Sequence, residues 1–471
     1  MLFARKNKDF TEGSIIPQII GFALPLMITG IMQLLFNTAD TIMVGRWGGA
    51  TPEECETALA AVGSCGSLIN LITLLFANLS LGGGVCTAHA IGAKDYDGVR
   101  KTVHTAVLVA LICGAIVLPV GLIGARPLLT LMGTDVAVLD QAVPYMTAYF
   151  CGIPASMLYN YCASILRSSG ETVRPMKYLF FAGGLNVILN AVMIFVFQMG
   201  ALGVGIASAV SHYVSCGLIL SHMFHADAPY RLSLKHLAID RERVKEILRI
   251  GIPAGVQGVV FSMSHVLIQS TVNSFGKAVV AGNTAAANLE GYAYQPMSAC
   301  YHATVTFVGQ HKGAKKFGRM KKCIWGCVMC VTAVGIVFGC AIVLLGPILL
   351  QLYVPGNAEA IAAGMTRMTV CTVVYFLRGL MEVGSGVMRG LGRSTTSMIT
   401  SLTGAVAFRI LWILLIFPLN PQLYMLYLSF PIAWVLTASA HYTLAAIALR
   451  REIRKHREEE PALSTVATDA R

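Results

Sequence analysis

One acidic residue stands alone in a long apolar stretch near the N-terminus. Between Glu12 and Arg46, Asp40 is the only ionisable side chain. If this stretch crosses a membrane, a carboxylate within it costs roughly 2.5–3.5 kcal/mol on insertion scales. Such a group must face water, pair with another group or take up a proton. Asp40 is therefore a candidate for reversible binding of a proton or a small cation.

Asp40 belongs to a polar stripe on an otherwise apolar segment. Thr29, Gln33, Asn37 and Asp40 recur at steps of three and four residues, so they share one helical face. Asp40 lies about 9 Å from the helix end at Arg46, at 1.5 Å per residue. We expect Asp40 to exchange ions with the outside, Asn37 to assist, and Gln33 to contact substrate. The alternative is that Asp40 is a hydrated residue near the interface.

Two amides in a later apolar segment are predicted partners of Asp40. Asn186 and Asn190 lie one helical turn apart. Both can hydrogen-bond a carboxylate, so we assign them to the same ion-coupling site. The alternative is hydrogen bonding between helices without a functional role, worth about 0.6 kcal/mol on average.

The second half of the chain carries its own candidates, Glu290 and Glu382. Glu290 shares a helix face with Asn283, Tyr294 and Tyr301. An acid among aromatic rings suits a lipophilic cation, through charge and cation–π contact. We therefore predict that Glu290 and Tyr294 bind substrate, with a structural role for Glu290 as the alternative.

Arg378 and Glu382 are spaced i, i+4, which favours an internal ion pair that makes both tolerable in a membrane. They remain candidates for substrate binding as well. The position that corresponds to Asp40 in the second half is Ile268. The expected chemistry is therefore asymmetric between the two halves.

The composition requires these residues to sit in membrane helices. Of 471 residues, 56% are hydrophobic and 12% are charged. These values exclude a disordered chain and an ordinary soluble enzyme. The 13 Cys lie mostly in apolar runs and are interpreted as small hydrophobic residues. The predicted fold class is an all-α polytopic membrane protein.

Charges, Gly and Pro divide the chain into twelve predicted transmembrane helices. They lie near 15–45, 58–88, 101–124, 137–166, 176–197, 201–224, 247–275, 279–309, 323–350, 359–388, 397–417 and 423–449.

Basic residues mark one side of the membrane. Of the 35 Lys and Arg, 29 fall at the two termini and in alternate loops, Arg5, Lys6 and Lys8 among them. The positive-inside rule then predicts that both termini are cytoplasmic. The net charge of +12 is thus a topology signal and favours contact with anionic lipids over nucleic acid.

The two halves repeat each other. Gly92-Ala-Lys-Asp-Tyr matches Gly313-Ala-Lys-Lys-Phe, and Ile165-Leu-Arg-Ser-Ser-Gly matches Val387-Met-Arg-Gly-Leu-Gly. Six helices per half make this a parallel repeat of two lobes, an architecture used for alternating access. We predict an N-terminal lobe at 1–224, a cytoplasmic linker at 225–246, a C-terminal lobe at 247–449 and a charged cytoplasmic tail at 450–471.

Motifs for other chemistry are missing from the sequence. It contains no GxxxxGK[ST] nucleotide-binding loop and no HExxH metal motif. We predict no enzyme, no catalytic residues, no metal and no cofactor, with an ion gradient as the energy source.

Several short motifs in order give the chain a resemblance to a known family. Ala39-Asp-Thr-Ile-Met-Val-Gly45, Leu202-Gly-Val-Gly-Ile-Ala-Ser and Ile250-Gly-Ile-Pro-Ala254 are among them, with the repeated loop motifs above. The sequence resembles the multidrug and toxic compound extrusion (MATE) transporters over nearly its whole length. It is most similar to bacterial members, since the thirteenth helix of eukaryotic relatives is missing.

The resemblance implies antiport of drugs, dyes and toxins, mostly lipophilic organic cations, against protons or sodium. It implies a monomer in the bacterial inner membrane and assigns ion coupling to Asp40. Some members carry an aspartate where this chain has Asn190, and some sodium-coupled members carry a glutamate where it has Phe261. Proton coupling is therefore favoured over sodium. A flippase for lipid-linked precursors, which in-span cations such as Arg409 would suit, and an integral-membrane enzyme are the competing interpretations.

Overall fold

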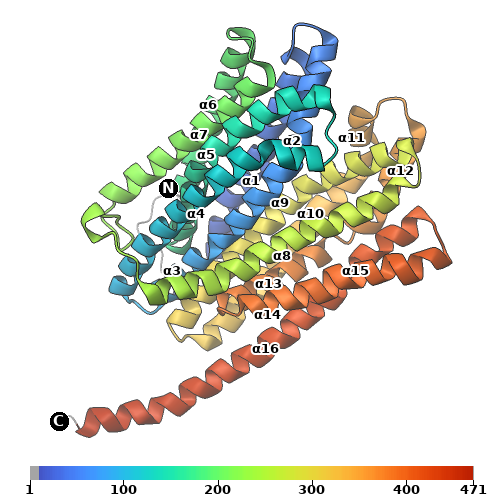
Figure 1. The fold of residues 1–471 in the computed structure, drawn as a ribbon. Helices are drawn as coiled ribbons and strands as arrows, with labels where there is room; N and C mark the ends of the chain where they lie inside the picture. The colour runs from blue at the N-terminus through green and yellow to red at the C-terminus, as the bar shows by residue number, and fades with distance from the viewer. Residues whose placement is uncertain (1–9, 470–471) are drawn as a thin grey trace. The chain divides into compact units, whose positions relative to one another are not determined.

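A computed structural model describes the backbone of residues 10–469 and the side chains up to residue 458. Arg5, Lys6 and Lys8, which the topology prediction places in the cytoplasm, lie outside the described residues. Every regular element in the described part of the chain is a helix (Figure 1). The predicted all-α fold class is confirmed.

The long helices follow the predicted order. The first half contains α1 (Ile15–Trp47), α2 (Pro52–Leu79), α3 (Leu81–Gly92), α4 (Tyr96–Leu131), α5 (Val136–Ser168), α6 (Val173–Phe195) and α7 (Gly200–His225). The second half contains α8 (Arg241–Asn273), α9 (Lys277–Gly313), α10 (Phe317–Leu344), α11 (Gly346–Tyr353), α12 (Ala358–Arg367), α13 (Phe376–Gly390), α14 (Ser394–Ser401), α15 (Phe408–Leu411) and α16 (Leu423–Asp469).

The described residues account for twelve membrane spans. Nine helices are long and apolar enough to cross a membrane, and a pair bent by 47°, Ala358–Thr372 with Phe376–Gly390, makes a tenth. The other two are α5 and α9, with 33 and 37 residues. Neither contains an equally apolar stretch, because polar residues are spread along both helices, but both are long enough to span a membrane. The twelve-helix prediction is confirmed by this fold.

The chain forms two compact units. The first comprises Leu24–Thr87 and Asp95–Val259, and the second comprises Ala88–Lys94, the chain from Val260 onward and the first turns of α1. The predicted lobe boundaries remain a prediction. Each unit has the same internal packing, because α5 packs on α2, α4 and α7, and α13 packs on α9, α10 and α16. These are equivalent helices under the repeat that the sequence indicates.

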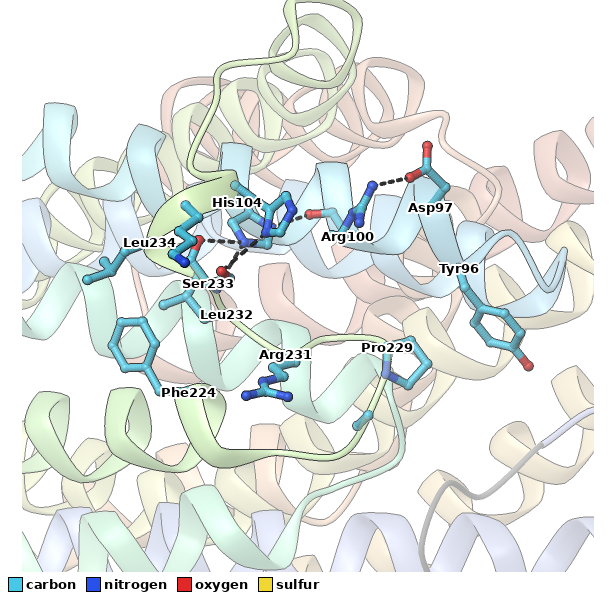
Figure 2. Close-up of a pocket in the computed structure, with 13 residues that line it drawn as sticks. Tyr96, Asp97, Arg100, His104, Phe224, Pro229, Arg231, Leu232, Ser233 and Leu234 are labelled. Atoms are coloured by element: carbon cyan, nitrogen blue, oxygen red, sulfur yellow. Dashed lines mark hydrogen bonds and ion pairs between the residues drawn. The ribbon is translucent and has the colours of Figure 1, made fainter.

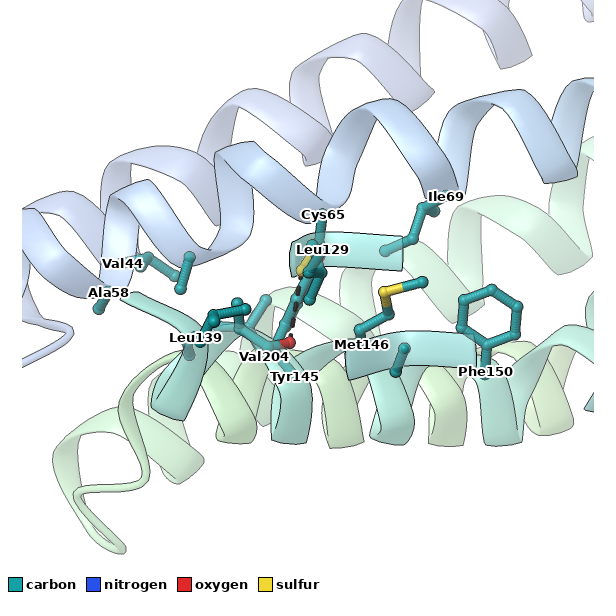
Figure 3. Packing of buried hydrophobic residues seen from close by; sticks show 14 of the residues in the cluster. Val44, Ala58, Cys65, Ile69, Leu129, Leu139, Tyr145, Met146, Phe150 and Val204 are labelled. Carbon is teal, nitrogen blue, oxygen red and sulfur yellow. Dashed lines mark hydrogen bonds between the residues drawn. The ribbon is translucent and has the colours of Figure 1, made fainter. Parts of the chain in front are cut away.

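The core of the first unit forms where α2, α4 and α5 meet. Figure 3 shows Cys65, Leu129 and Met146 packed there, and the Cys65 thiol donates to the carbonyl of Ala142 at 3.3 Å. At Gly121 of α4 a Cβ would overlap the ring of Phe150 in α5, so glycine permits the close approach of these helices. This packing holds α5 rigidly behind the site described below.

The segment between α7 and α8 is pinned to α4. Residues 226–240 are irregular apart from the short helix Leu234–His236, and they fall within the predicted linker. The His104 ring donates from Nδ1 to the Arg100 carbonyl at 2.7 Å, and its Nε2 accepts the Ser233 N–H at 3.1 Å. Figure 2 shows this contact beside a cavity of about 750 Å³. His104 thus ties the linker to the first unit.

Replacing His104 should release that segment. His104→Ala leaves the partly buried Ser233 N–H without its acceptor, a loss of about 1 kcal/mol. We expect hydrogen exchange at the Ser233 amide to accelerate severalfold. Exposed His225 is the matched control, because within the described part of the chain its ring hydrogen-bonds only the Ser221 carbonyl. Equal exchange at Ser233 in H104A and H225A would show that His104 does not hold the linker.

Candidate functional site

The carboxylate of Asp40 lies against the amide of Asn190. Asp40 is half-buried on α1, and Asn190 on α6 has no exposed surface. The Asn190 Nδ2 donates to Asp40 Oδ1 at 2.5 Å, across 150 residues of sequence. The predicted contact between Asp40 and Asn190 is therefore present, and it joins α1 to α6.

Asn186, one turn earlier on α6, completes the hydrogen bonding of the carboxylate. Its amide is satisfied when its nitrogen faces Asp40 and donates to Oδ1 at 3.0 Å and to Oδ2 at 3.3 Å. Its oxygen then accepts the Ser208 N–H of α7 at 3.3 Å. Two amide donors thus face a single acid inside one unit. We call Asp40, Asn186 and Asn190 the carboxylate–amide site.

The other members of the predicted stripe lie apart from this site. Asn37 and Gln33 are exposed, and within the described residues neither side chain hydrogen-bonds Asp40. The roles assigned to Asn37 in coupling and to Gln33 in substrate contact stay predictions.

Three neighbours of the site escaped the sequence analysis. Tyr145 and Tyr149 on α5 lie close enough to Asp40 to interact electrostatically with its carboxylate. The ring of His212 on α7 meets Tyr149 edge-on, with centroids 5.6 Å apart. Its Nε2 is buried without a hydrogen-bond partner among the described residues. The i, i+4 spacing of the tyrosines was the available signal.

A cavity opens near the site at the C-terminal end of α1. It measures about 960 Å³ and is lined by Gly45 of α1, Ile194 of α6 and the polar side chains of Asp140 and Gln141 on α5. Gly45 follows Asp40 by five residues, which is about 7.5 Å along the helix. This cavity brings polar space close to the carboxylate from the end opposite the N-terminus of α1.

The contact between α1 and α6 depends on a glycine. A Cβ at Gly183 would overlap the ring of Phe36, and Phe36 also packs on Phe180 with ring centroids 6.4 Å apart. The absence of a side chain at Gly183 therefore determines how closely α1 approaches Asn186 and Asn190 on α6.

Enlarging this position should loosen the carboxylate–amide site. Gly183→Val forces the Phe36 ring aside, at a cost of about 1–3 kcal/mol for overpacking. We expect lower transport in G183V and partial recovery in the double variant G183V/F36A, which removes the overlapping ring. The measurement is dye efflux from vesicles at equal protein content. If G183V/F36A transports no faster than G183V, the spacing of α1 and α6 is not the cause of the lost transport.

In the second unit, Glu290 forms a buried ion pair. Arg367 donates to both of its carboxylate oxygens, at 2.9 and 2.7 Å, and to the Asn283 side-chain oxygen at 2.8 Å. Glu290 also accepts from Thr372 at 3.4 Å, and its residue is 5% exposed. This geometry supports the structural alternative for Glu290. Its role in substrate binding stays a prediction.

The ion pair predicted between Arg378 and Glu382 is not formed in the described structure. Arg378 instead donates to the Tyr375 hydroxyl at 2.9 Å and lies over the Tyr294 ring at 4.2 Å. Stacking on an aromatic face draws the guanidinium away from α13 and toward α9. The protein's own arginine thus covers Tyr294, where the sequence suggested a substrate cation.

The fold and the repeat agree with a family comparison. The family model MatE matches residues 25–192 and again residues 253–415, once in each half. The chain belongs to the MatE family. Members of this family, the MATE proteins, are transporters rather than enzymes.

Relatives share most of their length with this MatE member. It is 26% identical over 84% of its length to the probable multidrug resistance protein YpnP of Bacillus subtilis, covering 87% of that protein. It is 20% identical to the multidrug export protein MepA of Staphylococcus aureus, with 86% and 88% of the chains covered.

A solved structure is similar over nearly the whole chain. It is a transporter of the MOP superfamily from Pyrococcus furiosus, described as having a binding pocket of reverse polarity. The TM-score is 0.87 at 22% identity, with 95% of this chain and 99% of that chain covered. The likeness supports the twelve-helix fold.

Proposed function

We propose that this MatE transporter exports bulky organic compounds, mainly lipophilic cations, in exchange for protons that bind Asp40. The names of the relatives YpnP and MepA support drug export as the activity. The proposed setting is a bacterial plasma membrane, with both termini in the cytoplasm. The observation that carries the proposal is the half-buried Asp40 carboxylate under two amide donors.

The chemistry of this contact supplies the coupling. The ionised carboxylate accepts hydrogen bonds from Asn190 and Asn186. A proton on Asp40 turns one oxygen into a donor and removes the charge that attracts both amides. The hold of α1 on α6 then weakens. A compound that binds better to one protonation state is exchanged for a proton, by linkage.

The same carboxylate favours cations as cargo. Within the first unit it supplies negative charge near Tyr149, whose partly buried ring suits an aromatic or quaternary ammonium compound. An organic cation and a proton then compete for one charge. Direct competition makes the exchange obligatory, because both cannot be bound with full affinity at once.

The test is efflux of ethidium from vesicles that contain the purified protein. One set carries only an imposed pH gradient, and the other only an imposed sodium gradient. We expect efflux with the pH gradient and none above protein-free vesicles with sodium alone. If only the sodium gradient drives efflux, sodium replaces the proton as the coupling ion. If neither the pH gradient nor the sodium gradient drives efflux, the proposal of coupled transport is overturned.

A further inference from the structure

Arg409 of the second unit is a buried cation without a polar partner. It is 3% exposed, and within the described residues it donates no hydrogen bond and forms no ion pair. Its Nε is buried without an acceptor, and its guanidinium lies over the Phe430 ring at 4.4 Å. A guanidinium has five N–H donors, and leaving them unsatisfied in an apolar span is costly.

Contacting rings of Phe430, Trp434 and Tyr375 connect Arg409 to Arg378, the charged side chain that acts on it most strongly. Arg378 is partly exposed, with one bond to Tyr375 and its face on Tyr294. It has no acid within salt-bridge distance, because Glu382 pairs with neither arginine in the described structure. The acid Glu290 is already paired with Arg367, so it does not neutralise Arg378 or Arg409. Arg378 and Arg409 therefore carry two positive charges against one unpaired acid.

The helix that carries Arg409 is irregular at this point. The single turn Phe408–Leu411 lies between two π-helical segments, Leu402–Ala407 and Trp412–Ile416. A third, Met368–Thr372, lies between Arg367 and Arg378. π-Helical segments re-aim side chains and are frequent at functional sites. The basic side chains of this unit are thus placed by non-standard helix geometry.

The surroundings combine charge with aromatic rings, some of them partly open. The exposed His265 ring lies tilted at 6.2 Å from the buried Phe430 ring, while Tyr294 and Glu382 are partly exposed. Charged surface at membrane depth is unfavourable against hydrocarbon, so it faces water, protein or a ligand. An anion with an apolar body would satisfy the free guanidinium donors and the aromatic rings together.

We propose that Arg409 and Arg378 form a binding site for the anionic head of an amphiphile, a phosphate, carboxylate or sulfonate joined to an apolar body. The site lies wholly in the second unit and does not depend on proton coupling at Asp40. Glu382 is a partly exposed acid one turn after Arg378 on the same helix, and its negative charge opposes the anion. Its neutralisation by Glu382→Gln should therefore tighten binding, which a purely structural role of the arginines would not predict.

The experiment titrates the full-length protein in a maltoside detergent by calorimetry. The probes are dioctanoyl phosphatidylglycerol, as a lipid head group, and naphthalene-1-sulfonate, as a soluble organic anion. Dodecyltrimethylammonium is the cationic control. We expect R409M and R378Q each to weaken anion binding at least about tenfold. R409K keeps the charge and should lose less, and E382Q should bind more tightly.

Exposed Arg126 lies in the other unit, so R126M is the matched control and should bind like wild type. Binding of only the phospholipid assigns the site to lipid head groups, and binding of the sulfonate assigns it to soluble anions; either supports the proposal. Wild-type protein that binds neither anion overturns it. So does anion binding that R409M and R378Q, eluting as folded protein, leave unchanged.

Discussion

Asp40→Asn is expected to abolish efflux driven by a pH gradient while the protein still folds and inserts. The amide keeps the size of the carboxyl group but neither binds a proton at working pH nor carries charge. Since Asp40 is the proposed exchange site, efflux of ethidium should fall to the level of protein-free vesicles. The measurement is initial efflux rate at matched protein content. Replacing an in-span charge should not lower stability, because it removes a costly group.

The control for this variant is Asp227→Asn. Asp227 is exposed in the segment after α7 and has no hydrogen bond or ion pair within the described structure. D227N makes the same chemical change outside the carboxylate–amide site and should transport like wild type. Efflux by D40N at more than half the wild-type rate under the pH gradient would reject Asp40 as the coupling residue.

Arg367→Met is expected to give the largest loss of stability. It leaves the Glu290 carboxylate buried without its two strong donors. Breaking one side of a buried ion pair costs about 3–5 kcal/mol. The double variant R367M/E290M removes both charges and should recover most of that loss. The measurement is the free energy of unfolding in detergent, from denaturant titration.

Exposed Arg450 on α16, which has no salt bridge within the described structure, provides the control R450M. R450M should unfold like wild type. If R367M and R450M have the same free energy of unfolding, the ion pair of Arg367 and Glu290 does not stabilise the fold. It is not the source of the loss if the double variant is no more stable than R367M.

The twelve-helix fold could be predicted because each span is a long apolar run with few charges. A search by hydropathy alone misses α5 and α9, since polar residues interrupt their apolar stretches. Their flanking charges and turns still marked them at 137–166 and 279–309. Helix ends were less predictable. α8 begins at Arg241 rather than near 247, because a charged amphipathic turn extends the helix beyond its apolar part.

The first site was partly predictable. Asp40 is conspicuous as a lone acid, and Asn186 and Asn190 have the right spacing to face one neighbour. His212 was not predictable, because a lone histidine in an apolar run is ordinary until its packing on Tyr149 is known. Asn37 was assigned to the ion-coupling site from helical periodicity. Periodicity alone does not separate a residue that faces the site from one that is exposed, as Asn37 is.

The second site shows the limit of local patterns. The partner of Glu290 is Arg367, 77 residues later, and no local spacing points to it. Arg378 has a local acid at i+4 yet prefers the aromatic face of Tyr294 on another helix. The π-helical segments around Arg409 have no simple sequence signature. Tertiary packing therefore decided each of these contacts.

The most direct test of the exchange at Asp40 is proton release on substrate binding. Ethidium is added to the purified protein in weakly buffered detergent solution, and the pH change is recorded with a dye. At a starting pH low enough for Asp40 to be protonated, the account predicts release of about one proton per bound ethidium in the wild type, and none in D40N. Equal proton release by both proteins, or binding by the wild type without any release, would contradict it.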